Sequence, residues 1–151
     1  MQMFVLITGR KRSGKDTFAR CLAKQLGCSY HSISAYVHEA LARLLNVDAL
    51  TIDRLKERSC IKFEGREISL RQLLQCLGTE VGRQMIDPDV WLSMLEKDLD
   101  DLPYNVISGI RFHNEVAFFE KKGITFVCEV EQEDRSLSLT RMSRRLAFQG
   151  S

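Results

Sequence analysis

The chain has 151 residues, which is about one domain on a prior of roughly 150 residues each, and its 44% hydrophobic and 28% charged residues are ordinary globular values. These values exclude a disordered, collagen-like or coiled-coil chain. With 22 Lys and Arg against 20 Asp and Glu, the net charge is only +2. The sequence therefore indicates no broad basic face, which argues against a nucleic-acid partner.

Targeting and redox features are weak in this sequence. The amino terminus lacks the basic and apolar stretches of a signal peptide, and no apolar run approaches the roughly 20 residues of a membrane span. The five cysteines are scattered without a Cys-x-x-Cys pair, which argues against a disulfide framework or a zinc site. We therefore expect a cytoplasmic protein without a membrane partner, and whether it forms a homodimer stays open. The last residues, 148–151, resemble a cloning or protease scar, so we expect a single domain over 1–148.

The first elements are predicted by apolar patterns. Residues 3–8 are continuously apolar before a Gly-rich turn, which predicts a strand buried on both faces of a parallel sheet. From Lys15 to Leu26 apolar residues recur at helical spacing, and Gly27 stands where a glycine commonly ends a helix. The chain is thus predicted to begin as strand, tight turn and helix.

The middle of the chain, about 34–99, is predicted to be helical, with helices over about 34–45, 51–58, 70–81 and 88–99. The signals for their starts are Ser34, Thr51, a capping box of Ser69 with Gln72, and the pair Asp87-Pro88.

The remaining elements complete an α/β pattern. Val106 and Ile107 predict the core of a second strand, residues 113–122 a helix stopped at Gly123, and residues 124–130 a third strand. Strands separated by helices indicate a three-layer α/β fold with a mainly parallel sheet. The arginine-rich end, 135–148, is interpreted as a candidate basic helix.

Residues 9–16 have the spacing of a phosphate-binding loop, with two glycines five apart and then lysine, between a predicted strand and a predicted helix. Glycine lets the backbone fold around a phosphate, so that N–H groups and the helix N-terminus face the anion while Lys15 reaches the β and γ phosphates. The expected ATP-binding residues are Gly9, Lys11, Arg12, Ser13, Gly14, Lys15, Asp16 and Thr17.

Asp16 departs from the usual phosphate loop, which carries a Ser or Thr hydroxyl for Mg²⁺ at this position. A carboxylate can still hold Mg²⁺ directly or through water, because hard cations prefer oxygen ligands. We therefore interpret Asp16 as the metal-binding residue. The alternative is that it only complements the positive end of the helix.

The run 11–17 closely resembles the P-loop of phage-type deoxynucleoside monophosphate kinases, a branch of the nucleoside monophosphate kinase superfamily in which aspartate replaces the hydroxyl residue. Residues 70–91, and 106–115 followed by Gly123, resemble the same family in the same order. The resemblance implies a P-loop NTPase fold and the transfer of the γ phosphoryl group of ATP, with Mg²⁺, to a deoxynucleoside monophosphate, which becomes the diphosphate.

Phosphoryl transfer brings two anions together, so a site needs cations besides the P-loop. Arg71, Arg83 and Arg111 are the candidates, because guanidinium is always charged and grips phosphate with two parallel donors. For each arginine alone, a solvated surface role is the alternative.

The resemblance also implies a role for each segment. It implies that an insertion at about 34–99 binds the acceptor nucleotide, with Arg71, Gln75 and Arg83 gripping it and Arg111 facing the transferring phosphate beside Lys15 and Asp16. Trp91 is included among the substrate-binding candidates as a surface on which a base can stack, although we favour packing. Glu115 is a candidate to orient Arg111, or a plain surface acid.

Two features depart from the family pattern. Many relatives carry aspartate where Gly109 stands, so a carboxylate close to the phosphates is missing here. The chain is also short after its third predicted strand, so an arginine-rich lid at about 131–148 is reduced or incomplete, or these residues form a solvated basic tail. The arginines concerned are Arg135, Arg141, Arg144 and Arg145.

Other functions stay open beside this one. A phosphomevalonate-kinase-like enzyme shares the Gly-x-x-x-x-Gly-Lys-Asp loop, but residues 75–79 and Trp91 favour a nucleotide acceptor. A catalytically weak or inactive nucleotide-binding protein is suggested by Gly109 and the short end. A nucleic-acid kinase is disfavoured by the charge of +2.

Overall fold

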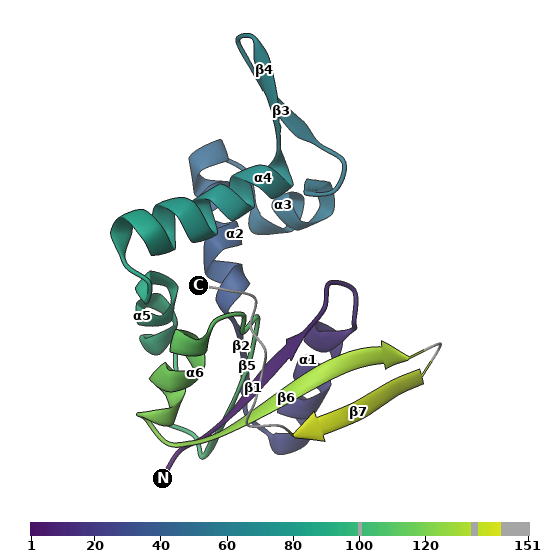
Figure 1. Ribbon diagram of the computed structural model, residues 1–151, viewed down its shortest axis with the longest axis vertical. Helices are drawn as coiled ribbons and strands as arrows, with labels where there is room; N and C mark the ends of the chain where they lie inside the picture. The colour runs from purple at the N-terminus through teal and green to yellow at the C-terminus, as the bar shows by residue number, and fades with distance from the viewer. Residues whose placement is uncertain (100, 134–135, 143–151) are drawn as a thin grey trace. The chain divides into compact units, whose positions relative to one another are not determined.

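The computed structural model (Figure 1) describes residues 1–99, 101–133 and 136–142. Its contacts divide the chain into two compact units. The first unit takes Met1–Ile33 together with the chain from Leu95 onwards, and the second takes Ser34–Met94. The insertion expected from the sequence spans about 34–99, and the second unit spans Ser34–Met94. In the described parts of the chain, no helix is both long and apolar enough to cross a bilayer.

The first unit is built on a five-stranded sheet in the order β2-β5-β1-β6-β7. Its strands are β1 (Met3–Gly9), β2 (Ser29–Ser32), β5 (Tyr104–Ser108), β6 (Ile124–Glu133) and β7 (Ser136–Met142). β1, β2, β5 and β6 are parallel to their neighbours among these four, and β7 runs antiparallel to β6. The predicted mainly parallel sheet is therefore confirmed.

Two helices cover opposite faces of this sheet, α1 (Lys15–Leu26) and α6 (His113–Glu120). Ile7 of β1 is buried in one cluster with Ala19 and Ala23 of α1. Phe4, on the other face because strand side chains alternate, lies with its ring centroid 5.2 Å from that of Phe119 of α6. β1 is thus covered on both faces, and the three-layer α/β prediction is confirmed.

The second unit contains mainly helices and one hairpin. Its elements in chain order are α2 (Ile33–Leu45), α3 (Ala49–Leu55), the hairpin β3 (Cys60–Phe63) and β4 (Arg66–Ser69), α4 (Leu70–Gln75), the π-helical segment η1 (Cys76–Ile86) and α5 (Val90–Glu96). Its core joins Leu41 and Ala42 of α2 to Ile52 of α3 and Leu70 of α4.

Several helix starts follow the prediction and others do not. The capping box is confirmed, since the Gln72 backbone N–H donates to Ser69 Oγ at 3.1 Å and the Ser69 N–H donates to Gln72 Oε1 at 2.9 Å. The Thr51 cap is wrong, because the carboxylate of Asp48 accepts the Thr51 N–H at 2.7 Å and begins α3 earlier. A carboxylate three residues ahead is the stronger acceptor for a free helix N–H.

The other two predicted starts are also displaced. α2 begins at Ile33, so Ser34 lies in its first turn instead of capping it. α5 is shorter than predicted, because Asp87 Oδ1 accepts the Asp89 N–H at 2.7 Å and this turn delays the helix to Val90.

Short strands account for the remaining differences. β2 and the β3–β4 hairpin were not predicted, and the hairpin interrupts the predicted helical middle. The predicted basic helix is wrong over Ser136–Met142, which forms β7. Leucines at 137 and 139 alternate with polar residues there, which is the period of a strand. Arg135 and residues 143–148 lie outside the described residues.

Candidate functional site

The phosphate loop follows β1 directly and leads into α1. Arg12 and Gly14 both adopt left-handed backbone conformations, with φ of 64° and 82°, which reverse the chain between strand and helix. The Ser13 N–H donates to the Arg10 carbonyl at 3.1 Å and closes the turn. The backbone thus has the compact fold that lets consecutive N–H groups face an anion.

Gly9 is the point of closest approach in this loop. A Cβ atom at Gly9 would lie 2.6 Å from both Ser13 Oγ and the Val130 carbonyl oxygen of β6. Only glycine fits at this distance, so the first glycine of the motif is required by packing against β6. The second, Gly14, is required by its positive φ.

A pocket of about 430 Å³ adjoins the loop. It is lined by Arg10, Lys11, Arg12, Ser13, Glu129, Val130 and Glu131. The lining includes three cationic and two acidic residues, and Ser13 Oγ is buried without a hydrogen-bond partner among the described residues. An unsatisfied buried hydroxyl beside cationic residues suits a polyphosphate ligand, because burial without a partner is costly.

The residues expected to bind ATP all lie on this loop or the first turn of α1. Ser13 is buried, Lys15 and Asp16 are half-buried, and Lys11, Arg12 and Thr17 are exposed. Asp16 has partners that the sequence did not indicate. Its Oδ1 accepts a hydrogen bond from Ser108 Oγ at 2.9 Å, and Tyr30 Oη lies 3.3 Å from the same atom. Burial raises the pKa of the Tyr30 phenol, so this group remains a protonated donor at neutral pH.

Arg111 follows β5, which pairs with β1 in parallel. Its side chain is exposed. The expected link to Glu115 is present, but it runs through the backbone. Glu115 is only 4% exposed, and its Oε2 accepts the Arg111 N–H at 2.7 Å and the Phe112 N–H at 3.0 Å. Gly109 has a φ of 85°, in the left-handed region that favours glycine.

The acceptor candidates belong to the second unit. Arg71 and Gln75 lie on α4 and are exposed, and Arg71 Nη2 is ion-paired with Glu57 Oε1. Arg83 Nη1 donates to the Pro88 carbonyl at 2.8 Å, next to α5. Trp91 is 8% exposed and donates its indole N–H to the Gly78 carbonyl at 2.8 Å, a placement typical of a packing residue.

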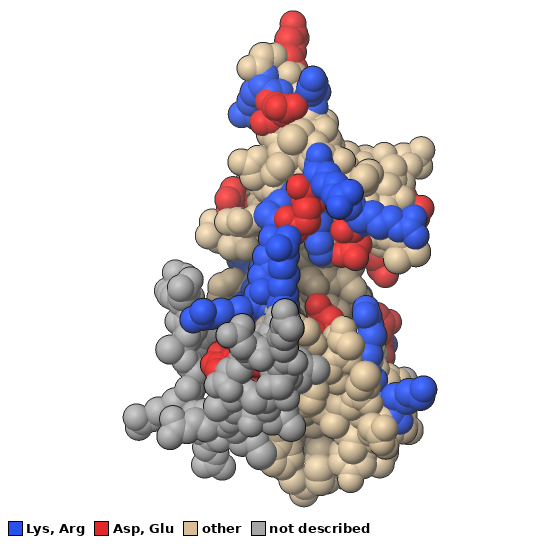
Figure 2. Space-filling model, turned by 90° about the vertical axis from the view of Figure 1, so that its right-hand side faces the viewer, with Lys and Arg blue, Asp and Glu red and all other residues tan. Residues whose placement is uncertain are grey.

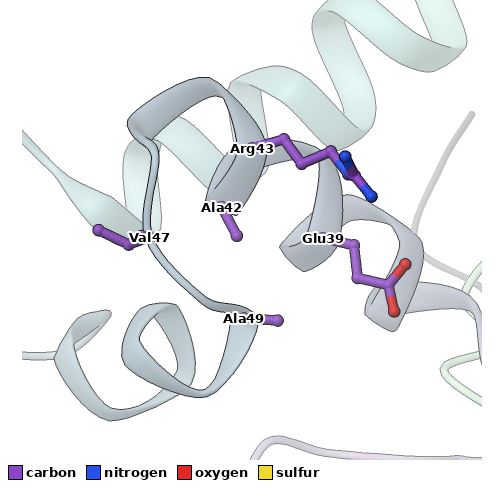
Figure 3. Close-up of a pocket in the computed structure, with 5 residues that line it drawn as sticks. All are labelled: Glu39, Ala42, Arg43, Val47 and Ala49. Atoms are coloured by element: carbon purple, nitrogen blue, oxygen red, sulfur yellow. The ribbon is translucent and has the colours of Figure 1, made fainter.

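A second pocket, of about 390 Å³, lies in the second unit (Figure 3). It is lined by Glu39, Ala42 and Arg43 of α2 and by Val47 and Ala49. One acid and one base stand one helical turn apart there. The phosphate-loop pocket, with three cations against two carboxylates and the buried Ser13 hydroxyl, is the better match to a polyphosphate.

Charged side chains of both signs lie on the face drawn in Figure 2. At the β3–β4 hairpin basic and acidic side chains are adjacent, and below the hairpin basic side chains gather into a larger patch with acidic ones beside it. The net charge of +2 is therefore compatible with local basic patches.

The donor set also fits a divalent cation held together with phosphate. Within the described ranges, no three His, Cys, Asp or Glu residues cluster to hold a metal. Asp16 and Ser108 nevertheless bring a carboxylate and a hydroxyl together, and both are oxygen donors. Mg²⁺ is usually bound by one or two carboxylates plus substrate phosphates rather than by an all-protein cage. These residues fit that mode.

A mainly parallel sheet, a glycine-flanked loop after its first strand and a cationic pocket beside that loop define an α/β protein of the P-loop class. Sequence comparison identifies the family. Residues 47–138, more than half of the chain, match the deoxynucleotide monophosphate kinase family, and the chain belongs to it. The match does not include the phosphate loop, so the family and the loop are independent observations.

A similar protein is the deoxynucleoside-5'-monophosphate kinase of Escherichia phage T5, which is 46% identical over 50 residues. This stretch covers 32% of the present chain and 20% of the phage protein. The chain thus matches only about a fifth of that relative's length.

Proposed function

We propose that the chain phosphorylates a deoxynucleoside monophosphate to the diphosphate, with ATP as donor and Mg²⁺ as cofactor. The observation that carries the proposal is the phosphate loop and its cationic pocket in a chain of the deoxynucleotide monophosphate kinase family. An oxygen of the acceptor phosphate attacks the γ phosphorus of ATP, the bond from that phosphorus to the bridging β–γ oxygen breaks, and ADP leaves.

The loop residues hold the donor in this proposal. Backbone N–H groups of the loop and of the start of α1 bind the β and γ phosphates, and Lys15 neutralises the charge that develops as the bond breaks. Mg²⁺, when bound through Asp16, neutralises the phosphate oxygens. Arg111, with its backbone held by Glu115, contacts the transferring group.

Acceptor binding is assigned to the second unit, through Arg71, Gln75 and Arg83. Trp91 is assigned to support this region, since its indole is bonded to the Gly78 carbonyl of η1. The partners are small nucleotides, and the proposal includes neither nucleic acid nor membrane. A nucleotide kinase works where ATP and deoxynucleotides are dissolved, so the proposal includes a cytoplasmic location.

A coupled assay of ADP release tests the proposal with ATP, Mg²⁺ and each common deoxynucleoside monophosphate in turn. We expect turnover with at least one acceptor, and its loss by at least a hundredfold in Lys15→Ala. Exposed Lys24, in the last turn of the same helix, provides the control variant Lys24→Ala, which should keep full activity. Absence of turnover with every acceptor contradicts the proposal.

A second candidate function is nucleotide binding without catalysis. It is favoured by Gly109, which supplies no carboxylate at the end of β5. Calorimetry that finds ATP binding, together with an absence of phosphoryl transfer, would support it. The phosphomevalonate alternative is weakened by the family match over residues 47–138 and is checked with phosphomevalonate in the same assay.

A further inference from the structure

Two hydroxyl groups from neighbouring strands hold the Asp16 carboxylate. Ser108 Oγ, at the carboxyl end of β5, donates to Asp16 Oδ1 at 2.9 Å, and Tyr30 Oη of β2 lies 3.3 Å from the same atom. The two hydroxyls are themselves hydrogen-bonded at 2.6 Å. Because each hydroxyl has one proton, Tyr30 donates to Ser108 while Ser108 donates to Asp16, and the three side chains form a triangle of close contacts around one carboxylate oxygen.

The triangle fixes the carboxylate in one orientation. Ser108 is fully buried and Tyr30 is half-buried, so both hydroxyls are part of the packed sheet. In the part of the chain that the structure describes, no hydrogen bond reaches the other oxygen, Asp16 Oδ2. One oxygen of the carboxylate is thus held by side chains of the packed sheet.

Tyr30 is held in turn by α1 and β5. The guanidinium carbon of Arg20, one helical turn after Asp16, lies 5.3 Å from the centroid of the Tyr30 ring. A cation over an aromatic face stabilises that geometry. The backbone of Tyr30 is in register with Val106, two residues before Ser108. Helix and strands therefore fix the distance between the two hydroxyls and Asp16.

On the basis of the proposed function, we propose that Tyr30 and Ser108 are positioning residues that hold Oδ1 of Asp16 so that Oδ2 faces the Mg²⁺ bound with the ATP phosphates. The usual Ser or Thr at this position has one oxygen on a short side chain. A carboxylate has two oxygens and an additional rotatable bond, so its orientation must be fixed by partners. Hydrogen bonds that orient metal-binding groups typically change metal affinity about 10–100-fold.

Three variants separate positioning from a general structural role. Tyr30→Phe keeps the ring and removes its hydroxyl, and Ser108→Ala removes the other hydroxyl. Tyr104→Phe is the matched control, because Tyr104 is 36% exposed at the opposite end of β5. For each variant, Mn²⁺ binding in the presence of ADP is measured by electron paramagnetic resonance, and ADP binding without metal is measured by calorimetry.

We expect Tyr30→Phe and Ser108→Ala each to weaken Mn²⁺ binding about tenfold, while ADP binding without metal stays within about twofold of the unaltered protein. Tyr104→Phe should change neither quantity. Unchanged Mn²⁺ affinity in both variants overturns the proposal, and so does a loss of metal-free ADP binding by the same factor. Neither measurement uses an acceptor nucleotide, so a failure here is distinguishable from absent kinase turnover.

Discussion

Single atoms decide whether the phosphate loop can form. At Gly9 the space that a methyl group needs is already occupied by Ser13 Oγ and the Val130 carbonyl oxygen, each 2.6 Å from an ideal Cβ. At Gly27 the same substitution meets nothing within 4 Å, but the backbone has a φ of 64°. The two glycines are therefore required for different reasons, contact in one case and backbone conformation in the other.

This difference gives a paired prediction. Gly9→Ala must displace Ser13 or β6, so we expect ATP affinity, measured by calorimetry, to fall at least tenfold. Gly27→Ala should cost about 1 kcal/mol of unfolding free energy through backbone strain, measured by urea denaturation, and leave ATP affinity unchanged. Equal ATP affinity in the two variants would contradict the role assigned to Gly9.

Glu115 provides a second prediction for single residues. Its buried carboxylate accepts two backbone N–H groups, from Arg111 and Phe112. Glu115→Ala leaves these donors unpaired, so we expect a loss of about 1–3 kcal/mol of unfolding free energy and a lower kcat, because the backbone of Arg111 is released. Urea denaturation and steady-state kinetics measure the two effects.

The control for this prediction is Glu120→Ala, at the exposed end of the same helix α6. A surface substitution of this kind changes stability by about 0.5 kcal/mol or less. If Glu115→Ala lowers stability but leaves kcat unchanged, Glu115 has no role in placing Arg111.

At the scale of elements, sustained apolar patterns predicted the fold, and the strands of four residues were missed. β1 and α1 carry sustained apolar signals, and the 12 residues of α1 were predicted from Lys15 to Leu26, as observed. β2, β3 and β4 have only four residues each, too few for a period to stand out. The arginines of 135–148 suggested a helix, although the leucine alternation within β7 already favoured a strand.

The same limit applies to the candidate site. The phosphate loop is contiguous, so its spacing alone indicates its chemistry. The partners of Asp16 are not contiguous with it, since Ser108 is 92 positions away and Tyr30 lies on a strand that was not predicted. Their meeting depends on the β2–β5 register, in which Ser32 is opposite Ser108. The available signal was Ser108, a polar residue at the end of the predicted strand that contains Val106 and Ile107.

A helix cap yields a prediction about pH. Hydrogen bonding to the Thr51 N–H holds the pKa of the Asp48 carboxyl below its ordinary value. A lowered folded-state pKa means that the stabilisation is present above the ordinary aspartate pKa of about 3.9 and is lost as pH falls through the lower folded value. Asp48→Asn keeps a capping oxygen without this titration.

Urea unfolding of both proteins between pH 6 and pH 2.5 checks this expectation. We expect the unfolding midpoint of Asp48→Asn to fall less steeply below about pH 4 than that of the unaltered protein. Parallel curves for the two proteins would show that Asp48 contributes nothing to the acid dependence.

At the scale of the whole molecule, the chain divides its chemistry between two compact units. The phosphate loop, Asp16 and Arg111 belong to the first unit, and Arg71, Gln75 and Arg83 belong to the second. The second unit has its own buried cluster around Leu41, Ile52 and Leu70. Because each unit has its own core, substitutions in one should leave ligand contacts in the other intact.

Kinetics can therefore assign each nucleotide to its unit. Arg71→Ala removes a charge-assisted contact worth about 1.5–3 kcal/mol, so we expect the KM for the deoxynucleotide to rise at least tenfold while the KM for ATP stays within about twofold. Glu57→Gln is the comparison variant, because it removes the carboxylate that pairs with Arg71 in this structure. This pair is partly exposed, with side chains 44% and 36% accessible, and such pairs contribute about 0–1 kcal/mol. Glu57→Gln should therefore leave the KM for ATP unchanged and lower the KM for the acceptor modestly, because Arg71 then binds the acceptor phosphate without first breaking an ion pair.

Equal increases of both KM values in Arg71→Ala would show that acceptor binding is wrongly assigned to the second unit.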